Sequence, residues 1–284
     1  MLHELPDRPV VRAAIRRATE VLGRDALDLD TPEALNPTVA VQLALFVAGT
    51  ATARALIAEG GHAAFVAGDS VGAFAAAVIA GTLTFEDAMH LVDLRARSMQ
   101  AAYPHGYGMG VLIGLEQRTV SQLAAAVNTP EAPVSAANVN TPLQVDISGA
   151  DDALGRLITL ARARGARRAF RLAVSTPSHT PLMAPVAAEI PWALSNVSLH
   201  PPDVPYVSNV GGRCAIPRRS ATTSLEASNA RFAGTTPPPC SSSSERACSS
   251  RCRPATSSLA SPRLHSLTPG ASPSTAGDSS PRLP

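Results

Sequence analysis

The chain of 284 residues contains no lysine, so all 24 of its basic residues are arginine. Aromatic residues make up only 4% of the sequence and charged residues 16%, and the formal net charge is +2. Proteins that bind nucleic acid or an anionic membrane through electrostatics normally carry a strong excess of basic residues, which nucleic-acid binders often interleave with aromatic ones. We therefore expect neither nucleic acid nor a membrane among the partners of this protein.

Cysteine is missing from the first 213 residues, and the four cysteines fall in the last quarter of the chain. Cys248 and Cys252 are four positions apart, but no pair of histidines accompanies them at the spacing of a zinc finger. We expect no metal site.

The start of the chain has no pattern of a secretory leader, because Glu4, Asp7 and Arg8 interrupt its first apolar residues. The long apolar runs 39–58 and 63–81 contain polar or charged residues, so we expect both to be buried rather than to span a membrane. These features predict a cytoplasmic protein.

The first 211 residues alternate between helical and strand patterns. We expect helices over 8–24, 36–59 and 73–80 and one after Thr84, a strand leading into Ser70, then strand 109–114, helix 117–127, strands 134–138 and 144–148, helix 151–164 and strand 167–174. The β-α-β-β-α-β order within 106–174 is that of a ferredoxin-like unit. It predicts a small lobe inserted into an α/β lobe made of 1–105 and 175–211.

The tail 212–284 has a different composition, rich in serine, proline, threonine and arginine. Such a composition predicts a disordered segment. Back-translation with codons of a GC-rich gene, read in another frame, yields a pattern typical of a globular core. We therefore hypothesise that the tail is translated out of frame.

The strongest chemical signal is Gly68-x-Ser70-x-Gly72, placed between a strand pattern and a helix pattern. A serine at such a turn exposes its hydroxyl, and the backbone N–H of Val71, at the start of the helix, can receive an oxyanion. A glycine-rich turn with no chemistry is the alternative, and the strand–turn–helix context favours the nucleophile.

Three further residues are candidates for the same site. His179 lies in a loop between a predicted strand and a predicted helix, where it can act as the base of Ser70. Arg95 lies on a helix and can hold a substrate carboxylate with two parallel hydrogen bonds, although arginines on helices often only extend to solvent. Asn140 lies beside a turn, where such residues usually satisfy local backbone groups.

Four spaced motifs resemble the malonyl-CoA:acyl-carrier-protein transacylase family over residues 2–211. They are Gly68–Gly72, Arg95–Gln100, Asn138–Pro142 leading to Ile147–Gly149, and Ser178–Met183. Asp69, where most members have histidine, and the stretch 103–109 are more similar to the epsilon subunit of malonate decarboxylase.

The resemblance implies an α/β-hydrolase-like acyltransferase lobe with a ferredoxin-like lobe over it. It implies Ser70 as nucleophile, His179 as base, Val71 N–H in the oxyanion hole, and Arg95 and Asn140 in substrate binding. The substrates would be malonyl-CoA and the pantetheine-type arm of an acyl-carrier protein, the carrier subunit of malonate decarboxylase, with no bound cofactor.

The sequence departs from the family in two places. Members begin with a strand and a loop whose glutamine supports the oxyanion hole, and this chain begins after that point. The carbonyl that orients the histidine would fall in the tail. Besides malonyl transfer for malonate decarboxylase, three alternatives stay open: a fatty-acid or polyketide malonyl transacylase, a serine hydrolase, and an inactive truncated remnant. A hydrolase would need an acid, for which Asp87, Asp93, Asp146 and Asp151 are available.

Overall fold

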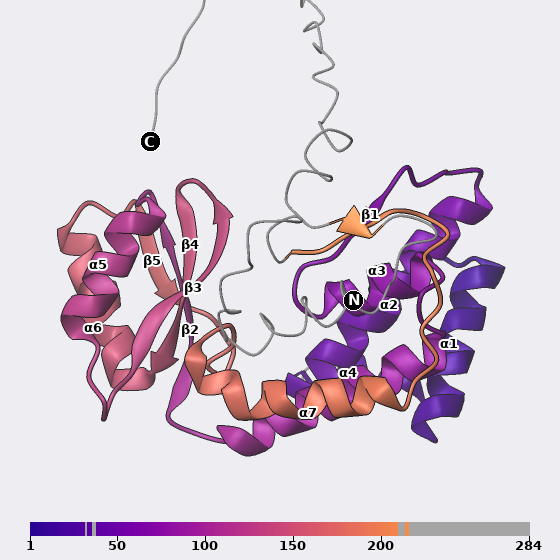
Figure 1. Cartoon of the computed structure of the whole chain (residues 1–284), viewed down its shortest axis with the longest axis horizontal. Helices are drawn as coiled ribbons and strands as arrows, with labels where there is room; N and C mark the ends of the chain where they lie inside the picture. The colour runs from indigo at the N-terminus through magenta and orange to yellow at the C-terminus, as the bar shows by residue number, and fades with distance from the viewer. Residues whose placement is uncertain (32, 36–37, 210–213, 216–284) are drawn as a thin grey trace, which may run out of the picture.

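The computed structural model describes residues 1–31, 33–35, 38–209 and 214–215, which form two lobes (Figure 1). The larger lobe contains helices α1 (Pro9–Leu22), α2 (Thr38–Ala58), α3 (Gly72–Ile79), α4 (Phe85–Ala102) and α7 (Ala184–Ser195), and the short 3-10 helices η1 (Leu2–Glu4), η2 (Ala26–Asp30) and η3 (Pro181–Met183). Its sheet has the order β1-β6-β7, formed by β1 (Val66–Ala67), β6 (Tyr206–Val207) and β7 (Cys214–Ala215).

The predicted α/β class is confirmed. Residues 212–213 and 216–284 of the predicted disordered tail lie outside the described residues. Cys214 and Ala215 depart from that prediction, because they pair antiparallel with Val207 and Tyr206. Ala215 is buried against the core of the larger lobe, which gives this short strand apolar contacts.

Helix α2 forms the centre of the larger lobe. It is apolar on nearly all sides, and α1, α3 and α4 pack against it. The fully buried rings of Phe46, Phe74 and Phe85 come from three of these four helices. Among the described residues, α2 alone is long and apolar enough to cross a membrane, but half of it is buried inside the protein, as in a core helix. These contacts agree with the buried helix that the sequence predicts.

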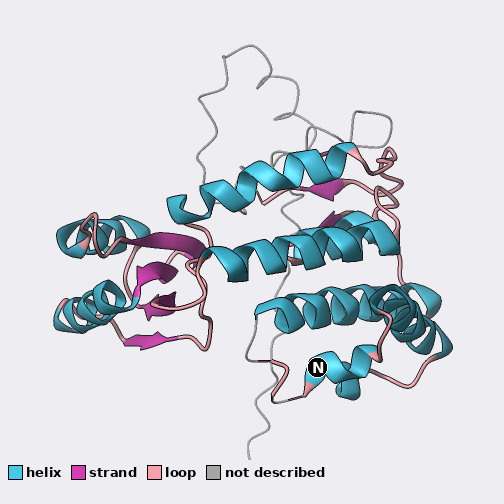
Figure 2. Ribbon diagram, turned by 90° about the horizontal axis from the view of Figure 1, so that it is seen from below, coloured by secondary structure: helices cyan, strands magenta, loops and turns pink. Residues whose placement is uncertain are grey.

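The smaller lobe is a four-stranded antiparallel sheet with the order β3-β4-β2-β5. Its strands are β2 (Tyr107–Ile113), β3 (Val134–Thr141), β4 (Gln144–Ala150) and β5 (Arg168–Arg171), and its helices are α5 (Gln117–Val127) and α6 (Asp151–Ala163). Both helices cover the face of the sheet that points away from the larger lobe (Figures 1 and 2). The β-α-β-β-α-β order is therefore as predicted.

Strand β4 shows how the two faces of this sheet differ. Val145 and Ile147 are fully buried against the two helices. Because side chains alternate along a strand, Asp146 and Ser148 lie on the opposite face, toward the larger lobe. That face is also buried, since Asp146 is 8% exposed and Ser148 fully buried. The sheet thus presents polar groups to the space between the lobes.

The start of β2 differs from the prediction. The sequence predicts a strand from residue 109, but the strand begins two residues earlier at Tyr107, which pairs with Ala150. The glycines allow close packing here. A Cβ on Gly108 would lie 2.9 Å from the carbonyl oxygen of Val174, and one on Gly110 would lie 2.9 Å from that of Phe170.

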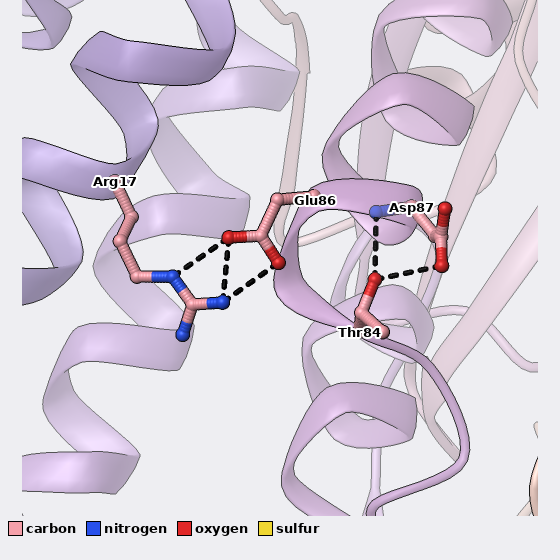
Figure 3. Close-up of polar contacts among 4 residues, drawn as sticks. All are labelled: Arg17, Thr84, Glu86 and Asp87. Atoms are coloured by element: carbon pink, nitrogen blue, oxygen red, sulfur yellow. Dashed lines mark hydrogen bonds and ion pairs between the residues drawn. The ribbon is translucent and has the colours of Figure 1, made fainter.

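Two polar contacts fix the start of α4, on which Arg95 lies (Figure 3). Thr84 caps the helix: its Oγ1 accepts from the N–H of Asp87 at 3.0 Å and donates to the carboxylate of Asp87 at 2.7 Å. Next to the cap, the guanidinium of Arg17 on α1 donates two hydrogen bonds of 2.7 Å to Glu86. The ion pair is exposed, so it contributes little to the stability of the fold. The cap contributes more, because it gives an acceptor to a backbone N–H at the helix start.

The turn between β1 and α3 depends on one glycine. A Cβ on Gly68 would lie 2.1 Å from the carbonyl oxygen of Gly72 and 2.4 Å from the nitrogen of Ala73. No side chain fits there, so the end of the strand and the start of the helix can touch only through glycine. A Cβ on Gly72, in contrast, would meet nothing within 4 Å.

We predict that Gly68→Ala lowers the free energy of unfolding on the order of 2–4 kcal/mol, because backbone atoms must move apart. The matched variant Gly72→Ala should stay within about 0.5 kcal/mol of the parent. Urea unfolding monitored by circular dichroism measures both. Equal stability of the two variants would contradict the close approach of strand and helix.

For the cap of α4, Thr84→Ala should cost about 1 kcal/mol of unfolding free energy, because the N–H of Asp87 loses its acceptor. Thr84→Ser keeps the hydroxyl and should retain most of that stability. Thermal unfolding of both variants tests this, and a loss in the serine variant as large as in the alanine variant would count against the cap.

Candidate active site

Ser70 lies in the turn between β1 and α3, half-buried, with a φ angle of 51°. This is the left-handed region, which a residue with a side chain adopts at a cost of about 1–3 kcal/mol. The turn is closed by hydrogen bonds from the N–H of Gly72 to the carbonyl of Asp69 at 2.8 Å and from that of Ala73 to the carbonyl of Ser70 at 3.1 Å. The strained backbone presents the hydroxyl at the surface of the turn.

His179 lies next to that hydroxyl, as the sequence predicts. Its Nε2 is 3.0 Å from Oγ of Ser70, and its own φ angle is 60°, again in the left-handed region. Ser70 and His179 are the two non-glycine residues with a positive φ angle among the described residues. Because such strain gathers at functional sites, the coincidence of both with one hydrogen bond points to a reactive pair.

The segment that carries His179 is held by several hydrogen bonds. The hydroxyls of Thr176 and Ser178 lie 3.2 Å apart, and Thr180 Oγ1 donates to the carbonyl of Pro177 at 2.8 Å. Tyr103, at the end of α4, donates from its hydroxyl to the carbonyl of Leu182 at 2.9 Å. The imidazole is therefore placed by a fixed loop.

Arg95 completes the group. It projects from α4, is 2% exposed, and its Nη2 donates to Oγ of Ser70 at 3.2 Å. Burial lowers the pKa of Arg95 to about 10, and the negative charge of Asp69 opposes that shift. The guanidinium therefore remains protonated at neutral pH. The structure thus brings Ser70, His179 and Arg95 to one point, as predicted.

Gln42 is a residue that the sequence analysis did not identify as part of the site. Its Oε1 accepts a hydrogen bond from Nη1 of Arg95, and its Nε2 donates to Oγ1 of Thr38 at 3.1 Å. It is 6% exposed and lies within the apolar helix α2. A single amide in an otherwise apolar run was the available signal, because a buried polar group requires a partner.

The other two predicted residues have different positions. Val71 follows Ser70 at the start of α3, and no hydrogen bond from its N–H is found among the residues that the structure describes. Asn140 lies in β3 of the smaller lobe, where its Nδ2 donates to Oδ1 of Asp146 at 3.0 Å. No hydrogen bond within the described ranges joins Asn140 to Ser70, so its role in substrate binding remains a prediction.

Two carboxyl groups lie beside predicted site residues, Asp69 beside Ser70 and Asp146 beside Asn140. Asp69, adjacent to Ser70, accepts at Oδ1 from Nδ2 of Asn209 at 3.2 Å. Burial raises the pKa of Asp146, the hydrogen bond from Asn140 partly offsets this, and the charge of Asp69 adds to the increase. Asp69 therefore acts electrostatically on a group from each lobe.

The four aspartates considered as the acid of a hydrolase triad all have other partners. Asp87 bonds to Thr84, Asp93 pairs with Arg97 at 2.7 Å, Asp146 bonds to Asn140, and Asp151 pairs with Arg171 at 2.6 Å. Within the described part of the chain, no group of three His, Cys, Asp or Glu side chains is placed to hold a metal ion. The arrangement suits acyl transfer by a Ser–His pair beside a buried cation.

Known proteins that are similar to this chain are acyltransferases. Residues 1–237 match the acyl transferase domain family. The chain is 38% identical over 211 residues to the malonyl CoA-acyl carrier protein transacylase of Escherichia coli K12, which covers 72% of this chain and 68% of the relative. The fold is similar to the transacylase of Coxiella burnetii, with a TM-score of 0.75, 33% identity, and coverage of 83% of this chain and 75% of that one.

A second solved structure, described as a type II polyketide acyl-carrier protein in complex with its malonyl-transacylase, matches with a TM-score of 0.73 and 35% identity. It covers 80% of this chain and 74% of that one. With a family match over most of the chain and relatives of this identity, the chain belongs to the malonyl-CoA:acyl-carrier-protein transacylase family of acyltransferases.

Proposed function

We propose that this protein transfers a malonyl group from malonyl-CoA to the thiol of an acyl-carrier protein, through a malonyl ester on Ser70. The observation that carries the proposal is the double contact of Oγ of Ser70, 3.0 Å from Nε2 of His179 and 3.2 Å from Nη2 of Arg95. An imidazole beside a hydroxyl activates it as a nucleophile. A buried guanidinium beside the same hydroxyl suits an acyl group that ends in a carboxylate.

In the first half-reaction, Nε2 of His179 accepts the hydroxyl proton while Oγ of Ser70 bonds to the carbonyl carbon of the thioester. The carbonyl oxygen becomes an oxyanion, and the N–H of Val71 is the proposed donor to it. Collapse of this intermediate breaks the C–S bond. The coenzyme A sulfur then takes the proton from His179, which leaves a malonyl ester and a neutral imidazole.

In the second half-reaction, the thiol on the pantetheine-type arm of the carrier gives its proton to His179. Its sulfur attacks the ester carbonyl, the bond to Oγ breaks, and the proton returns to Ser70. Atoms and protons balance over the two halves without a cofactor. The order predicts ping-pong kinetics.

Arg95 would hold the free carboxylate of the malonyl group. Its guanidinium already lies at hydrogen-bond distance from the reacting oxygen, and Gln42 fixes the other side of the fork. Because the guanidinium is buried and held on one side by Gln42, a substrate carboxylate beside it would form strong charge-assisted hydrogen bonds. An acetyl group offers no such contact.

The carrier is the finer part of the proposal. Asp69 and the stretch 103–109 favour the carrier subunit of malonate decarboxylase. The relatives favour a fatty-acid or polyketide carrier, because one solved structure pairs a malonyl-transacylase with a polyketide carrier. Both readings use the same chemistry, and the transfer experiment below separates them.

We predict that Arg95→Ala lowers kcat/KM for malonyl-CoA on the order of 100-fold, the equivalent of about 3 kcal/mol of lost charged hydrogen bonds. The value for acetyl-CoA should change far less, since it has no carboxylate to bind. The measurement is release of coenzyme A in the presence of carrier. Arg97→Ala is the matched control, because Arg97 is two positions along the same helix, exposed and paired with Asp93. Equal losses for both substrates would remove the carboxylate-binding role.

Transfer to a carrier distinguishes the remaining functions. Incubation with isotope-labelled malonyl-CoA and either a malonate decarboxylase carrier or a fatty-acid carrier should label the carrier thiol, at least about tenfold faster for the physiological one. His179→Ala should slow the labelling about 100- to 10,000-fold. Rapid hydrolysis of a neutral ester without any label on either carrier would instead support a serine hydrolase, and no reaction with any substrate would support an inactive remnant.

A further inference from the structure

The residue before the nucleophile is a carboxylate in a defined position. The carbonyl of Asp69 closes the turn around Ser70, and its side chain is tied to Asn209, which follows β6. The side chain of Asp69 is exposed, directly beside the half-buried nucleophile Ser70. Asp69 therefore places a carboxylate directly beside the turn that holds the nucleophile.

That charge reaches the buried guanidinium. Nη2 of Arg95 lies 3.2 Å from Oγ of Ser70, the residue next to Asp69 in the chain. The negative charge of Asp69 favours the protonated form of Arg95 against the effect of burial. Asp69 is thus a nearby partial counter-charge for Arg95, placed by the same turn that places the nucleophile.

A second carboxyl group lies in range from the other lobe. Asp146 is 8% exposed on the face of β4 that points toward the larger lobe, and Asn140 donates to it at 3.0 Å. The charge of Asp69 makes ionisation of Asp146 less favourable. The carboxyl groups of Asp69 in the larger lobe and Asp146 in the smaller lobe are therefore close enough to influence each other.

A malonyl group would bring a further carboxylate into this arrangement. It would gain attraction from Arg95 and suffer repulsion from Asp69, since both charges act on the same region. An acetyl group would feel neither effect. Asp69 therefore changes the relative binding of malonyl and acetyl groups, and it does not change the acyl-transfer step that both share.

We infer that Asp69 is a specificity-determining residue, whose carboxylate weakens the hold of Arg95 on a substrate carboxylate and so limits the preference for malonyl over uncharged acyl groups. The inference rests on the proposed function, because it concerns the acyl group that Ser70 accepts. If Asp69 only supported the turn, its removal would slow acylation by malonyl-CoA and by acetyl-CoA alike. The inference predicts instead that removal of its charge raises the rate with malonyl-CoA relative to acetyl-CoA.

The test is Asp69→Asn, which removes the charge, keeps the shape and leaves an oxygen to accept from Asn209. Acylation of Ser70 is measured by intact mass after rapid quenching, with malonyl-CoA and acetyl-CoA in parallel. The ratio of the two acylation rates should rise about three- to tenfold in favour of malonyl-CoA, while the acetyl rate stays within about twofold. The difference from the parent should shrink at high salt, because the exposed charge is screened.

Three further variants serve as controls for the effect of the charge. Asp69→Glu keeps the charge and should keep the parental ratio, and Asp69→Ser removes the charge with a smaller side chain and should raise the ratio. Asp152→Asn, an exposed position in the first turn of α6, should leave the ratio unchanged.

The outcomes separate the two claims. A parent protein that is malonylated, but whose ratio is unchanged or lowered in both uncharged variants, overturns the inference and leaves the proposed function standing. A parent protein that accepts neither acyl group overturns both.

Discussion

The hydroxyl of Ser70 reaches His179 and Arg95 because its backbone is held in the left-handed region, between a strand and a helix that touch through Gly68 and Gly72. Such a conformation is unfavourable for a serine, and it persists only where the surroundings enforce it. Here the enforcement comes from backbone packing. The position of the nucleophile is thus a consequence of one steric constraint, and the imidazole and guanidinium are arranged around it.

The second requirement of the site is a buried positive charge, the guanidinium of Arg95. Removal of a guanidinium from solvent is costly, so each of its groups needs an acceptor. Gln42, Ser70 and the charge of Asp69 meet part of that need. In the proposed reaction a substrate carboxylate enters the same environment, and the balance between Arg95 and Asp69 then determines how strongly it is held. The charges of Arg95 and Asp69, more than Ser70 and His179, would then determine the preference for malonyl over acetyl groups.

Much of the fold could be predicted from the sequence because its signals are local. Helix α5 spans the predicted residues 117–127, and α4 begins at the predicted cap Thr84. The strand ends were predicted less accurately, since β1 extends over only two residues and β2 starts two residues before the predicted residue 109. These boundaries depend on which strand lies alongside, and a single sequence contains no direct record of such pairing.

The candidate site divides in the same way. Ser70, Arg95 and His179 could be proposed because each lies in a motif, and the structure places all three together. Gln42 was not proposed, and Asp146 was considered only as the acid of a hydrolase, because their contacts depend on which face of a helix or strand is buried and on what lies opposite. Asn140 was expected to bind substrate; the structure shows its hydrogen bond to Asp146, and the binding role stays a prediction.

The most direct measurement of the central claim is the location of the acyl group. The full chain is mixed with malonyl-CoA, quenched in acid within a second, digested, and mapped by tandem mass spectrometry. We predict a single malonyl ester, on the hydroxyl of Ser70, that disappears in Ser70→Ala. A malonyl group on any other residue, or full labelling of the alanine variant, would contradict the account.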